Sequence, residues 1–421
     1  MSEWKRYKLS ELYEMSSGIS STKEQAGHGS PFLSFSVVFN NYFLPDSLID
    51  LMDTTDGEKQ KYSINEGDIF LTRTSETVDE LAMSSVALKD YPEASFSGFL
   101  KRLRPVDKTI VYPKFMAFYL RSPLFRRTII NNTVMTLRAS FNEAMFSYLE
   151  IMLPDFDTQK KIGDFLYSLE KKKQINNQIN QELEAMAKTL YDYWFVQFDF
   201  PDQNGNPYKS SGGKMVYHPE LKREIPEGWG VEKLEELAQF KNGINYEKTS
   251  SGSEKVKIIN VRNISSSTIF INQTDLDEIF LENDKSTNFI VNEGMILITR
   301  SGIPGATRLV SELEAKTVYS GFIIASEVND LIYKNLIFYY LKHVEEVLKN
   351  QSAGTIMKNI SQSVLTDMAV SLPPQNLLLK FNSIIDNLLE KMKNVQRQNQ
   401  ELTQLRDWLL PMLMNGQVKV E

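Results

Sequence analysis

Apolar side chains recur at alternating steps of four and three residues along residues 381–413, which is the spacing of a long helix with one apolar stripe. The same spacing occurs 219 residues earlier, along residues 162–194, where polar residues interrupt it. We therefore predict two long helices, at residues 154–198 and 373–421. Each is expected to be about 55–60 Å long at a rise of about 1.5 Å per residue.

A helix of this length with one apolar stripe needs a partner, and the simplest partner in the chain is the other helix. Packing about a pseudo-two-fold axis makes the pair antiparallel and brings Asn180 close to Asn399. Ile175 and Ile179 are expected to share the first stripe. The alternative is that each helix docks on its own globular domain. The predicted coiled-coil seam consists of Ile162, Leu166, Leu169, Asn180, Leu183, Leu190, Phe381, Ile385, Leu388, Met392, Asn399, Leu402 and Leu409.

The segments before the two helices also resemble each other. The stretch "INEGDIFLTR" at residues 64–73 returns as "VNEGMILITR" at residues 291–300, and "SGF" occurs once in each copy. In both copies a glycine turn leads into an apolar run rich in β-formers, which predicts a buried strand. Residues 113–129 and 334–350 have apolar side chains at helical spacing. The pattern predicts a duplicated domain that contains both helices and strands.

These elements place the chain in the α+β class. We expect two mixed α/β domains related by pseudo-two-fold symmetry and separated by an antiparallel two-helix coiled coil. A segment rich in Gly, Pro, Asn and Ser predicts a loop between the copies. The predicted ranges are 1–153 for the first domain, 154–198 for the first long helix, 199–225 for the linker, 226–372 for the second domain and 373–421 for the second long helix.

Composition narrows the possible chemistry. The 421 residues include no cysteine and three histidines, and the formal net charge is −7. Thiolate zinc sites and cysteine nucleophiles are therefore excluded, and the scattered histidines favour surface positions over metal ligands. No apolar run approaches the ~18–20 residues of a membrane span, and the N-terminal sequence lacks the apolar segment of a signal peptide. We expect a cytoplasmic protein without membrane contact.

Motifs of known catalytic sites are missing. The sequence has no Gly-rich phosphate loop, G-x-S-x-G elbow or H-E-x-x-H motif. Asp202, Glu220 and Lys222 match a loose nuclease pattern that could hold Mg²⁺ on its carboxylates. That pattern lies in the predicted linker and occurs only once in a duplicated chain. We expect no catalytic residue, metal or cofactor in this chain, and a nuclease is a minor alternative.

Basic residues are concentrated in the first copy, where residues 101–138 hold nine Lys or Arg and one acid. Such a block with interleaved aromatic residues can follow a phosphate backbone, or it can bond to the acidic stretch at residues 46–93. Thr-Arg pairs end the repeated strand, and arginine and threonine can contact phosphates, although a structural role there is the alternative. Polar loops at residues 136–143 and 354–362 precede the last strand of each copy. The candidate nucleic-acid-binding residues are Thr72, Arg73, Thr74, Ser75, Lys101, Arg102, Arg104, Arg138, Ser140, Asn142, Thr299, Arg300, Ser301, Lys358, Asn359 and Ser361.

The order of these motifs resembles the specificity (S) subunit of type I restriction–modification systems over essentially the whole chain. "LP" followed by "QKKI" opens the first helix within residues 153–162, and "LYDYWFVQFDFP" closes it at residues 190–201. "IPEGW" begins the second copy at residues 225–229. One departure is Leu378, which stands where the first helix has Gln159.

The resemblance implies that each domain is a target recognition domain for one half of a bipartite, asymmetric site in double-stranded DNA. It implies that the helices set the gap between the half-sites and dock two methyltransferase (modification) subunits, which use S-adenosylmethionine to methylate adenine. Restriction subunits would add ATP-driven translocation and Mg²⁺-dependent cleavage, whereas the S subunit itself performs no reaction. The alternative function is a non-catalytic coiled-coil scaffold that binds other proteins.

Overall fold

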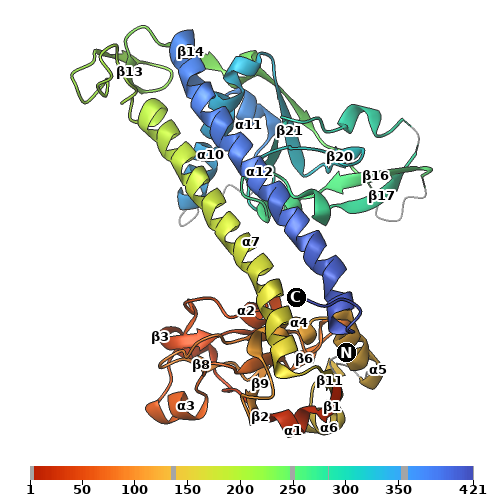
Figure 1. The fold of residues 1–421 in the computed structure, drawn as a ribbon. Coiled ribbons are helices and arrows are strands. Elements are labelled where there is room, and N and C mark those ends of the chain that lie inside the picture. The colour runs from red at the N-terminus through yellow and green to blue at the C-terminus, as the bar shows by residue number, and fades with distance from the viewer. Residues whose placement is uncertain (1–3, 134–138, 247–251, 283, 352–358, 421) are drawn as a thin grey trace. The chain divides into compact units, whose positions relative to one another are not determined.

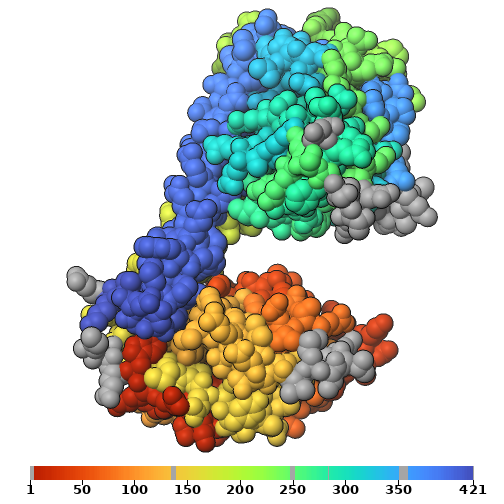
Figure 2. All heavy atoms as spheres, turned by 90° about the vertical axis from the view of Figure 1, so that its right-hand side faces the viewer, coloured from red at the N-terminus to blue at the C-terminus, as the bar shows by residue number. Residues whose placement is uncertain are grey.

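The structure is a computed structural model that describes residues 4–133, 139–246, 252–282, 284–351 and 359–420, and the remaining residues are grey in Figures 1 and 2. The chain forms two compact units. Unit 1 comprises Met1–Ile175 and Gln398–Glu421, and unit 2 comprises Asn176–Arg397. The units differ from the predicted domain ranges because each takes one part of both long helices.

Unit 1 begins with a small mixed domain of short helices and strands (Figure 1). In chain order its elements are β1 (Lys5–Lys8), α1 (Leu9–Leu12), β2 (Tyr13–Ser17), η1 (Lys23–Gln25), β3 (Ala26–Leu33), α2 (Phe35–Asn40), β4 (Leu51–Met52), α3 (Asp56–Lys61), β5 (Ile69–Thr72), β6 (Thr74–Ser75), η2 (Val78–Glu80), β7 (Ser84–Val86), β8 (Ser95–Phe96), β9 (Leu100–Pro105), α4 (Pro113–Tyr119), α5 (Pro123–Asn132), β10 (Ala139–Ser140), α6 (Glu143–Tyr148) and β11 (Glu150–Leu153).

Unit 2 contains a second mixed domain, which follows the linker. In chain order the elements of linker and domain are β12 (Met215–His218), β13 (Arg223–Pro226), β14 (Gly230–Lys233), α8 (Leu234–Leu237), β15 (Ala238–Asn242), β16 (Glu254–Ile259), α9 (Val261–Ser265), η4 (Gln273–Asp275), β17 (Asp277–Leu281), η5 (Thr287–Phe289), β18 (Ile296–Thr299), β19 (Thr307–Leu309), β20 (Thr317–Tyr319), β21 (Ile323–Val328), η6 (Leu331–Tyr333), α10 (Lys334–Gln351), α11 (Gln362–Thr366) and β22 (Ala369–Leu372).

The sheets of the two domains have the same topology. The four-stranded sheet runs β2-β9-β5-β7 in unit 1 and β15-β21-β18-β19 in unit 2. The three-stranded sheet runs β4-β3-β8 and β17-β16-β20, and in both its middle strand has one antiparallel and one parallel neighbour. A third pair joins the first and last strands of each domain, β1 with β11 and β14 with β22. The predicted duplication of a mixed α/β domain is confirmed.

The repeated phrase forms the centre of each four-stranded sheet. All four residues of β5 and of β18 are buried, as their continuous apolar sequences predict for a strand covered on both faces. The turns before them have Gly67 at φ 91° and Gly294 at φ 85°, a region that other residues rarely adopt. The amide N–H groups of these glycines donate to the carbonyls of Ala87 and Val310, both at 2.9 Å. The repeated sequence therefore forms the same turn and strand in both domains.

The helices after β9 and β21 differ between the two domains. α10 is one helix of 18 residues, whereas the corresponding segment of unit 1 is broken into α4 and α5 at Ser122 and Pro123. A proline disfavours helical conformation in the residue before it, and Pro123 begins the new helix at its first position. The side chain of Ser122 accepts a hydrogen bond from the Phe125 amide and so caps that helix.

The two long helices are α7 (Phe156–Tyr191), with 36 residues, and α12 (Gln375–Met414), with 40 residues (Figure 1). In unit 1 the beginning of α7 packs with the end of α12. Arg406 of α12 forms an ion pair with Glu170 of α7 at 2.5 Å. The apolar residues that the two helices bring to the core of unit 1 include Ile162, Leu166, Leu169, Leu402, Leu409, Leu410 and Leu413.

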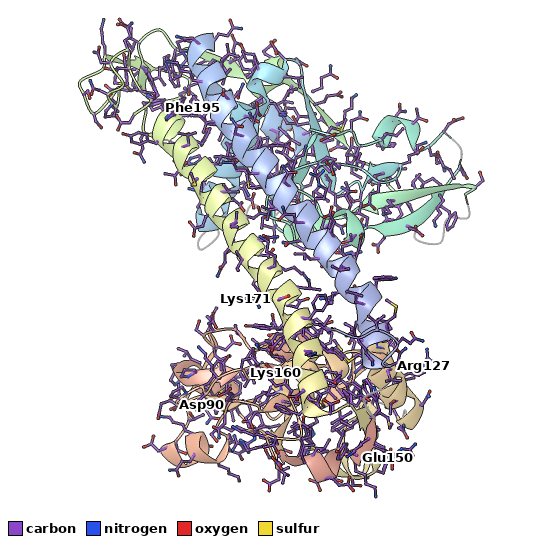
Figure 3. The ribbon with its side chains drawn as sticks, viewed as in Figure 1. Asp90, Arg127, Glu150, Lys160, Lys171 and Phe195 are labelled. Carbon is purple, nitrogen blue, oxygen red and sulfur yellow. The ribbon has the colours of Figure 1, made fainter. Side chains whose placement is uncertain are left out.

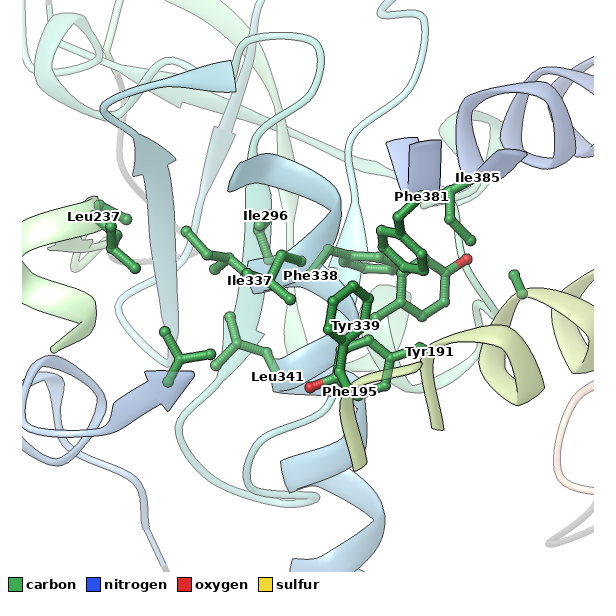
Figure 4. Close-up of a cluster of buried hydrophobic side chains, with 14 of the residues drawn as sticks. Tyr191, Phe195, Leu237, Ile296, Ile337, Phe338, Tyr339, Leu341, Phe381 and Ile385 are labelled. Atoms are coloured by element: carbon green, nitrogen blue, oxygen red, sulfur yellow. The ribbon is translucent and has the colours of Figure 1, made fainter. Parts of the chain in front are cut away.

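In unit 2 the end of α7 packs with the beginning of α12. Phe195 lies just after α7 (Figure 3). Its ring and that of Tyr191 pack against the ring of Phe381 (Figure 4), and the centroids of Phe195 and Phe381 are 4.7 Å apart. Because opposite ends meet in each unit, the helices run antiparallel, as predicted. The remaining helix residues of this core include Leu183, Ala187, Leu190, Ile385, Leu388 and Met392. The pseudo-two-fold relation stays a prediction.

The expectation that Ile175 and Ile179 share the seam is wrong. Their side chains are 42% and 40% exposed, whereas Asn176 is 1% exposed. The helix keeps the phase of its four-three spacing through a polar stretch instead of turning towards the nearest isoleucines. The predicted meeting of Asn180 with Asn399 stays a prediction, since these residues belong to different units.

The linker also differs from the predicted loop, because β12 and β13 form an antiparallel hairpin. Before the hairpin, Phe200 stacks between Tyr208 and Trp229, with ring centroids 4.7 and 5.2 Å away. This aromatic stack fixes the linker to the domain of unit 2. The prediction of a loop relied on the polar composition of the segment and did not take these aromatic residues into account.

Candidate functional site

The Thr-Arg pairs that end β5 and β18 have the same local geometry. Thr72 and Thr299 are fully buried. The Thr72 hydroxyl donates to the carbonyl of Glu80 at 3.2 Å and accepts from the amide of Met83 at 2.9 Å. The Thr299 hydroxyl bonds the Ile303 carbonyl and accepts from the Ala306 amide. In both units the threonine hydroxyl therefore holds the loop that follows the strand, and DNA contact by Thr72 and Thr299 stays a prediction.

The arginine of each pair points along the repeated "SGF" segment. The Arg73 amide donates to the carbonyl of Phe99 at 2.8 Å, and its guanidinium donates to the carbonyl of Gly98 at 3.4 Å. The Arg300 amide likewise donates to the carbonyl of Phe322 at 2.8 Å, and its guanidinium to that of Gly321 at 3.2 Å. Neither guanidinium forms an ion pair among the described residues. Both remain available to an external anion.

The polar loop before the last strand returns to the same arginine in each unit. The amide of Phe141 donates to the Arg73 carbonyl, and the amide of Ile360 donates to the Arg300 carbonyl, both at 2.8 Å. In unit 1 this contact continues as a short pairing of β6 with β10. The structure therefore brings together loops that are far apart in sequence. We define the loop-and-arginine site of each unit as the Thr-Arg pair, its "SGF" segment and this returning polar loop.

The predicted residues of this site divide by exposure. Thr72, Ser75 and Thr299 are buried. Asn142 and Ser361 are the N-caps of α6 and α11, where their side chains accept from the amides three residues later. Arg138 and Lys358 lie outside the described residues. The predicted residues that are at least partly exposed here are Arg73, Thr74, Ser140, Asn142, Arg300, Ser301, Asn359 and Ser361.

The basic residues of β9 make contacts within unit 1. Arg102 is 8% exposed and donates to the carbonyl of Ser63 at 2.6 Å. Arg104 donates to both carboxylate oxygens of Asp68, at 2.8 and 2.6 Å, and these hydrogen bonds raise the pKa of Arg104. Lys101 is 7% exposed and donates to the Ser17 hydroxyl at 2.8 Å. Direct DNA contact by these three side chains stays a prediction, and the structure describes them as internal contacts.

Other cations of the basic block are also used internally. The Arg121 guanidinium donates to the carbonyls of Ser84, Val38, Phe39 and Asn41, at 2.6 to 3.0 Å. Burial lowers the pKa of Arg121 to about 10. This arginine therefore joins the end of α2 to β7, which neither of the sequence-based interpretations of the block anticipated.

Sequence reasoning missed two residues at the site. Phe99 and Phe322 are 66% and 64% exposed, and each follows the glycine that the neighbouring arginine contacts. The duplicated "SGF" was visible in the sequence, but it served only to align the two copies. Its repetition was the available signal.

The nuclease alternative finds no support in the linker. The Asp202 carboxylate accepts hydrogen bonds from the amides of Asn204 and Asn206, both at 2.8 Å, so it stabilises its own turn. Within the described ranges no group of three or more His, Asp or Glu side chains is placed to hold a metal. Among all residues that the structure describes, no helix is both long and apolar enough to cross a membrane.

Comparison with known proteins agrees with this duplicated architecture. The sequence profile of the type I restriction modification DNA specificity domain matches residues 1–185 and again residues 226–404. This chain belongs to the type I restriction–modification specificity family. The two matches each span one mixed domain and part of the long helix that follows it, so the profile repeats with the structural duplication.

Curated relatives bear the same family name. The type I restriction enzyme MjaIX specificity subunit of Methanocaldococcus jannaschii is 27% identical over 65% of this chain, which spans 61% of that subunit, so less than two thirds of its length is matched. The HindI specificity subunit of Haemophilus influenzae is 23% identical over 99% of this chain and 100% of that subunit. A crystal structure of the S subunit from M. genitalium covers 98% of this chain and 96% of its own, with a TM-score of 0.52 and 15% identity. This last similarity shows a shared fold.

Proposed function

We propose that this chain is the non-catalytic, DNA-recognising subunit of a type I restriction–modification complex. Each unit would bind one half of a bipartite, asymmetric site in duplex DNA. The observation that carries the proposal is the presence, in both units, of one arginine that is held by "SGF" carbonyls and joined by a returning polar loop. Arginine and loop polar groups are suited to phosphates and base edges. A repeated frame with different surrounding side chains fits two readers of different sequences.

The proposed partners are two methyltransferase subunits and the restriction/translocase subunits, which would bind S-adenosylmethionine, ATP and Mg²⁺. We base the proposal of protein docking on the long helices on exposed apolar side chains. Trp408 and Leu379 of α12 are 66% and 55% exposed, and Met186 of α7 is 56% exposed.

Domain replacement tests the recognition part of the proposal. Residues 1–153 are exchanged for the corresponding domain of another family member, and adenine methylation is mapped across a host genome that expresses the chimera with its methyltransferase. The expected result is a new sequence in one half-site, with the other half-site and the spacer unchanged. Each wrong base pair should cost ~1–3 kcal/mol, so the original half-site should be lost completely. Changes in both halves, or in neither, would contradict the modular reading.

A coiled-coil scaffold is the second candidate, because the same exposed helix residues also fit a protein that only joins partners. Duplex binding separates the two functions. The complex with the methyltransferase should retain DNA at about 50 mM salt and release it as salt rises, since phosphate contacts displace counterions. Failure to bind any duplex at low salt would favour the scaffold.

A further inference from the structure

Phe99 and Phe322 are apolar side chains that the fold leaves uncovered at equivalent positions. Each stands just before the strand that flanks the central strand of its sheet, β9 or β21. Their exposed fractions, 66% and 64%, are nearly equal. A single exposed phenylalanine needs no explanation. Two at the same place, in domains whose nearby strands have diverged, indicate a surface that is covered by the same kind of ligand.

The backbone that presents each ring is fixed. The Ile19 amide donates to the Phe96 carbonyl at 2.9 Å, and the Gly98 amide donates to the Ile19 carbonyl at 2.7 Å. In unit 2, Ile244 makes the same two bonds, with Tyr319 and Gly321, at 2.9 and 2.7 Å. The turn that carries each aromatic side chain is thus held by two backbone hydrogen bonds.

Close backbone contact reinforces both turns. A Cβ atom on Gly18 would lie 2.3 Å from the carbonyl oxygen of Ser97, and one on Gly243 would lie 2.2 Å from that of Ser320. No side chain fits at either position. Both copies therefore keep a glycine that lets one strand end lie directly against the "SGF" segment.

The neighbouring charge identifies the ligand. The guanidinium of Arg73 or Arg300 contacts the residue before the ring, at 3.4 or 3.2 Å. An apolar ring beside a cation that has no carboxylate partner in the described residues matches a nucleic acid, which offers base faces next to phosphates. An apolar protein groove would match the ring but not the cation.

We propose that Phe99 and Phe322 are DNA-contact residues, each of which packs against a base step of its half-site while Arg73 or Arg300 binds the adjoining phosphate. This inference rests on the proposed DNA-binding function and adds the residues that touch the bases. The two rings act on different half-sites, so each should affect recognition of its own half only.

The test uses the full chain in complex with its methyltransferase and a duplex that carries both half-sites. Phe99→Ala and Phe322→Ala are each expected to weaken binding about tenfold, without changing the slope of log affinity against log salt, because a base contact releases no counterion. Phe99→Trp should retain most of the affinity. Ile49→Ala and Phe280→Ala are matched controls, since these side chains are 88% and 47% exposed but lie outside the loop-and-arginine sites.

The possible outcomes distinguish a DNA contact of the two rings from a protein contact and from a chain that does not bind DNA. On a duplex whose first half-site is scrambled, one of the two phenylalanine variants should lose its effect and the other should keep it. Wild-type affinity in both phenylalanine variants would overturn the inference while the DNA-binding function stands. Absence of duplex binding by the wild-type complex would instead reject the function itself. Loss of the methyltransferase from either variant on gel filtration would also overturn the inference, because the ring would then be a protein contact.

Discussion

The two units share a backbone frame but differ in the charge of one strand. Lys101, Arg102 and Arg104 of β9 stand where β21 has Ile324, Ala325 and Glu327, as the pairing with neighbouring strands shows. The turn before the central strand differs in the same way, because Asp68 of unit 1 corresponds to Met295 of unit 2. The charged partners in unit 1 have been replaced together, and the hydrogen bonds of the frame are unchanged.

This difference separates two kinds of cation. Arg102 and Arg104 donate hydrogen bonds to groups inside unit 1, and unit 2 has no basic residue at either position. Arg73 and Arg300 occupy the same place in both units and have no ion-pair partner among the residues that the structure describes. A dense run of basic residues in the sequence therefore marks an interior network, whereas a shared isolated arginine marks the candidate interface.

The largest expected effect comes from breaking the network that only unit 1 contains. Asp68→Ala would leave Arg104 without the carboxylate that it contacts through two hydrogen bonds. Removing one partner of a buried pair should lower the free energy of unfolding by about 3 kcal/mol. Met295→Ala, the matched change in unit 2, should lower it by less than about 1.5 kcal/mol. Urea unfolding followed by circular dichroism measures both, and equal losses would remove the contrast between the units.

A shared frame should respond equally in both units. Gly18→Ala and Gly243→Ala each place a methyl group against a carbonyl oxygen and should destabilise the protein by about 2–3 kcal/mol. Gly57→Ala is the control, because nothing lies within 4 Å of the added Cβ. The same unfolding measurement applies. Tolerance of the substitution in one unit only would show that the frames are not equivalent.

Arg73→Ala and Arg300→Ala sharpen the distinction between surface and interior cations. Each should weaken duplex binding by the methyltransferase complex by about 1–2 kcal/mol and reduce the salt slope by about 1, as expected for a lost phosphate contact. Arg102→Met should leave the slope unchanged and lower the free energy of unfolding instead. Binding at several salt concentrations distinguishes these results. If the salt dependence of binding were unchanged in both alanine variants, the two arginines would have a structural role and not a phosphate contact.

The smallest effect is expected on the exposed side of α7. Ile175→Ser and Ile179→Ser should change the free energy of unfolding by less than about 0.5 kcal/mol, because both side chains are exposed, at 42% and 40%. Leu166→Ser, at a fully buried position, should cost several times more. Thermal unfolding suffices for the comparison. A large decrease in the free energy of unfolding for Ile175→Ser would show that Ile175 packs in the coiled-coil seam after all.

The parts of the fold that depend on local pattern were predictable from the sequence. Four-three spacing predicted both long helices, and the repeated glycine turn with its apolar run predicted β5 and β18. The error at Ile175 and Ile179 arose because residue type was weighted above helical phase. The phase passes through Asn176, which is buried despite its polarity.

The candidate site was less predictable because it depends on distant pairings. Sequence shows that Arg104 is charged, but not that Asp68 lies beside it across the sheet. It shows that residues 139–140 are polar or small, but not that they pair with β6 next to Arg73. Exposure of Phe99 likewise follows from a turn that is fixed by a bond to Ile19, about 80 residues earlier.

Unit 1 consists of two separate segments of the chain, and this affects the order in which the two units can fold during synthesis. Residues 398–421 supply Leu410, Leu413 and Met414 to the core that surrounds Leu166, yet the ribosome adds them more than 200 residues after Ile175. Unit 2 is a single uninterrupted stretch between these segments. During synthesis the later domain is therefore able to complete its core first, while the earlier one waits with apolar helix surface uncovered, in reverse of the usual N-to-C sequence of folding.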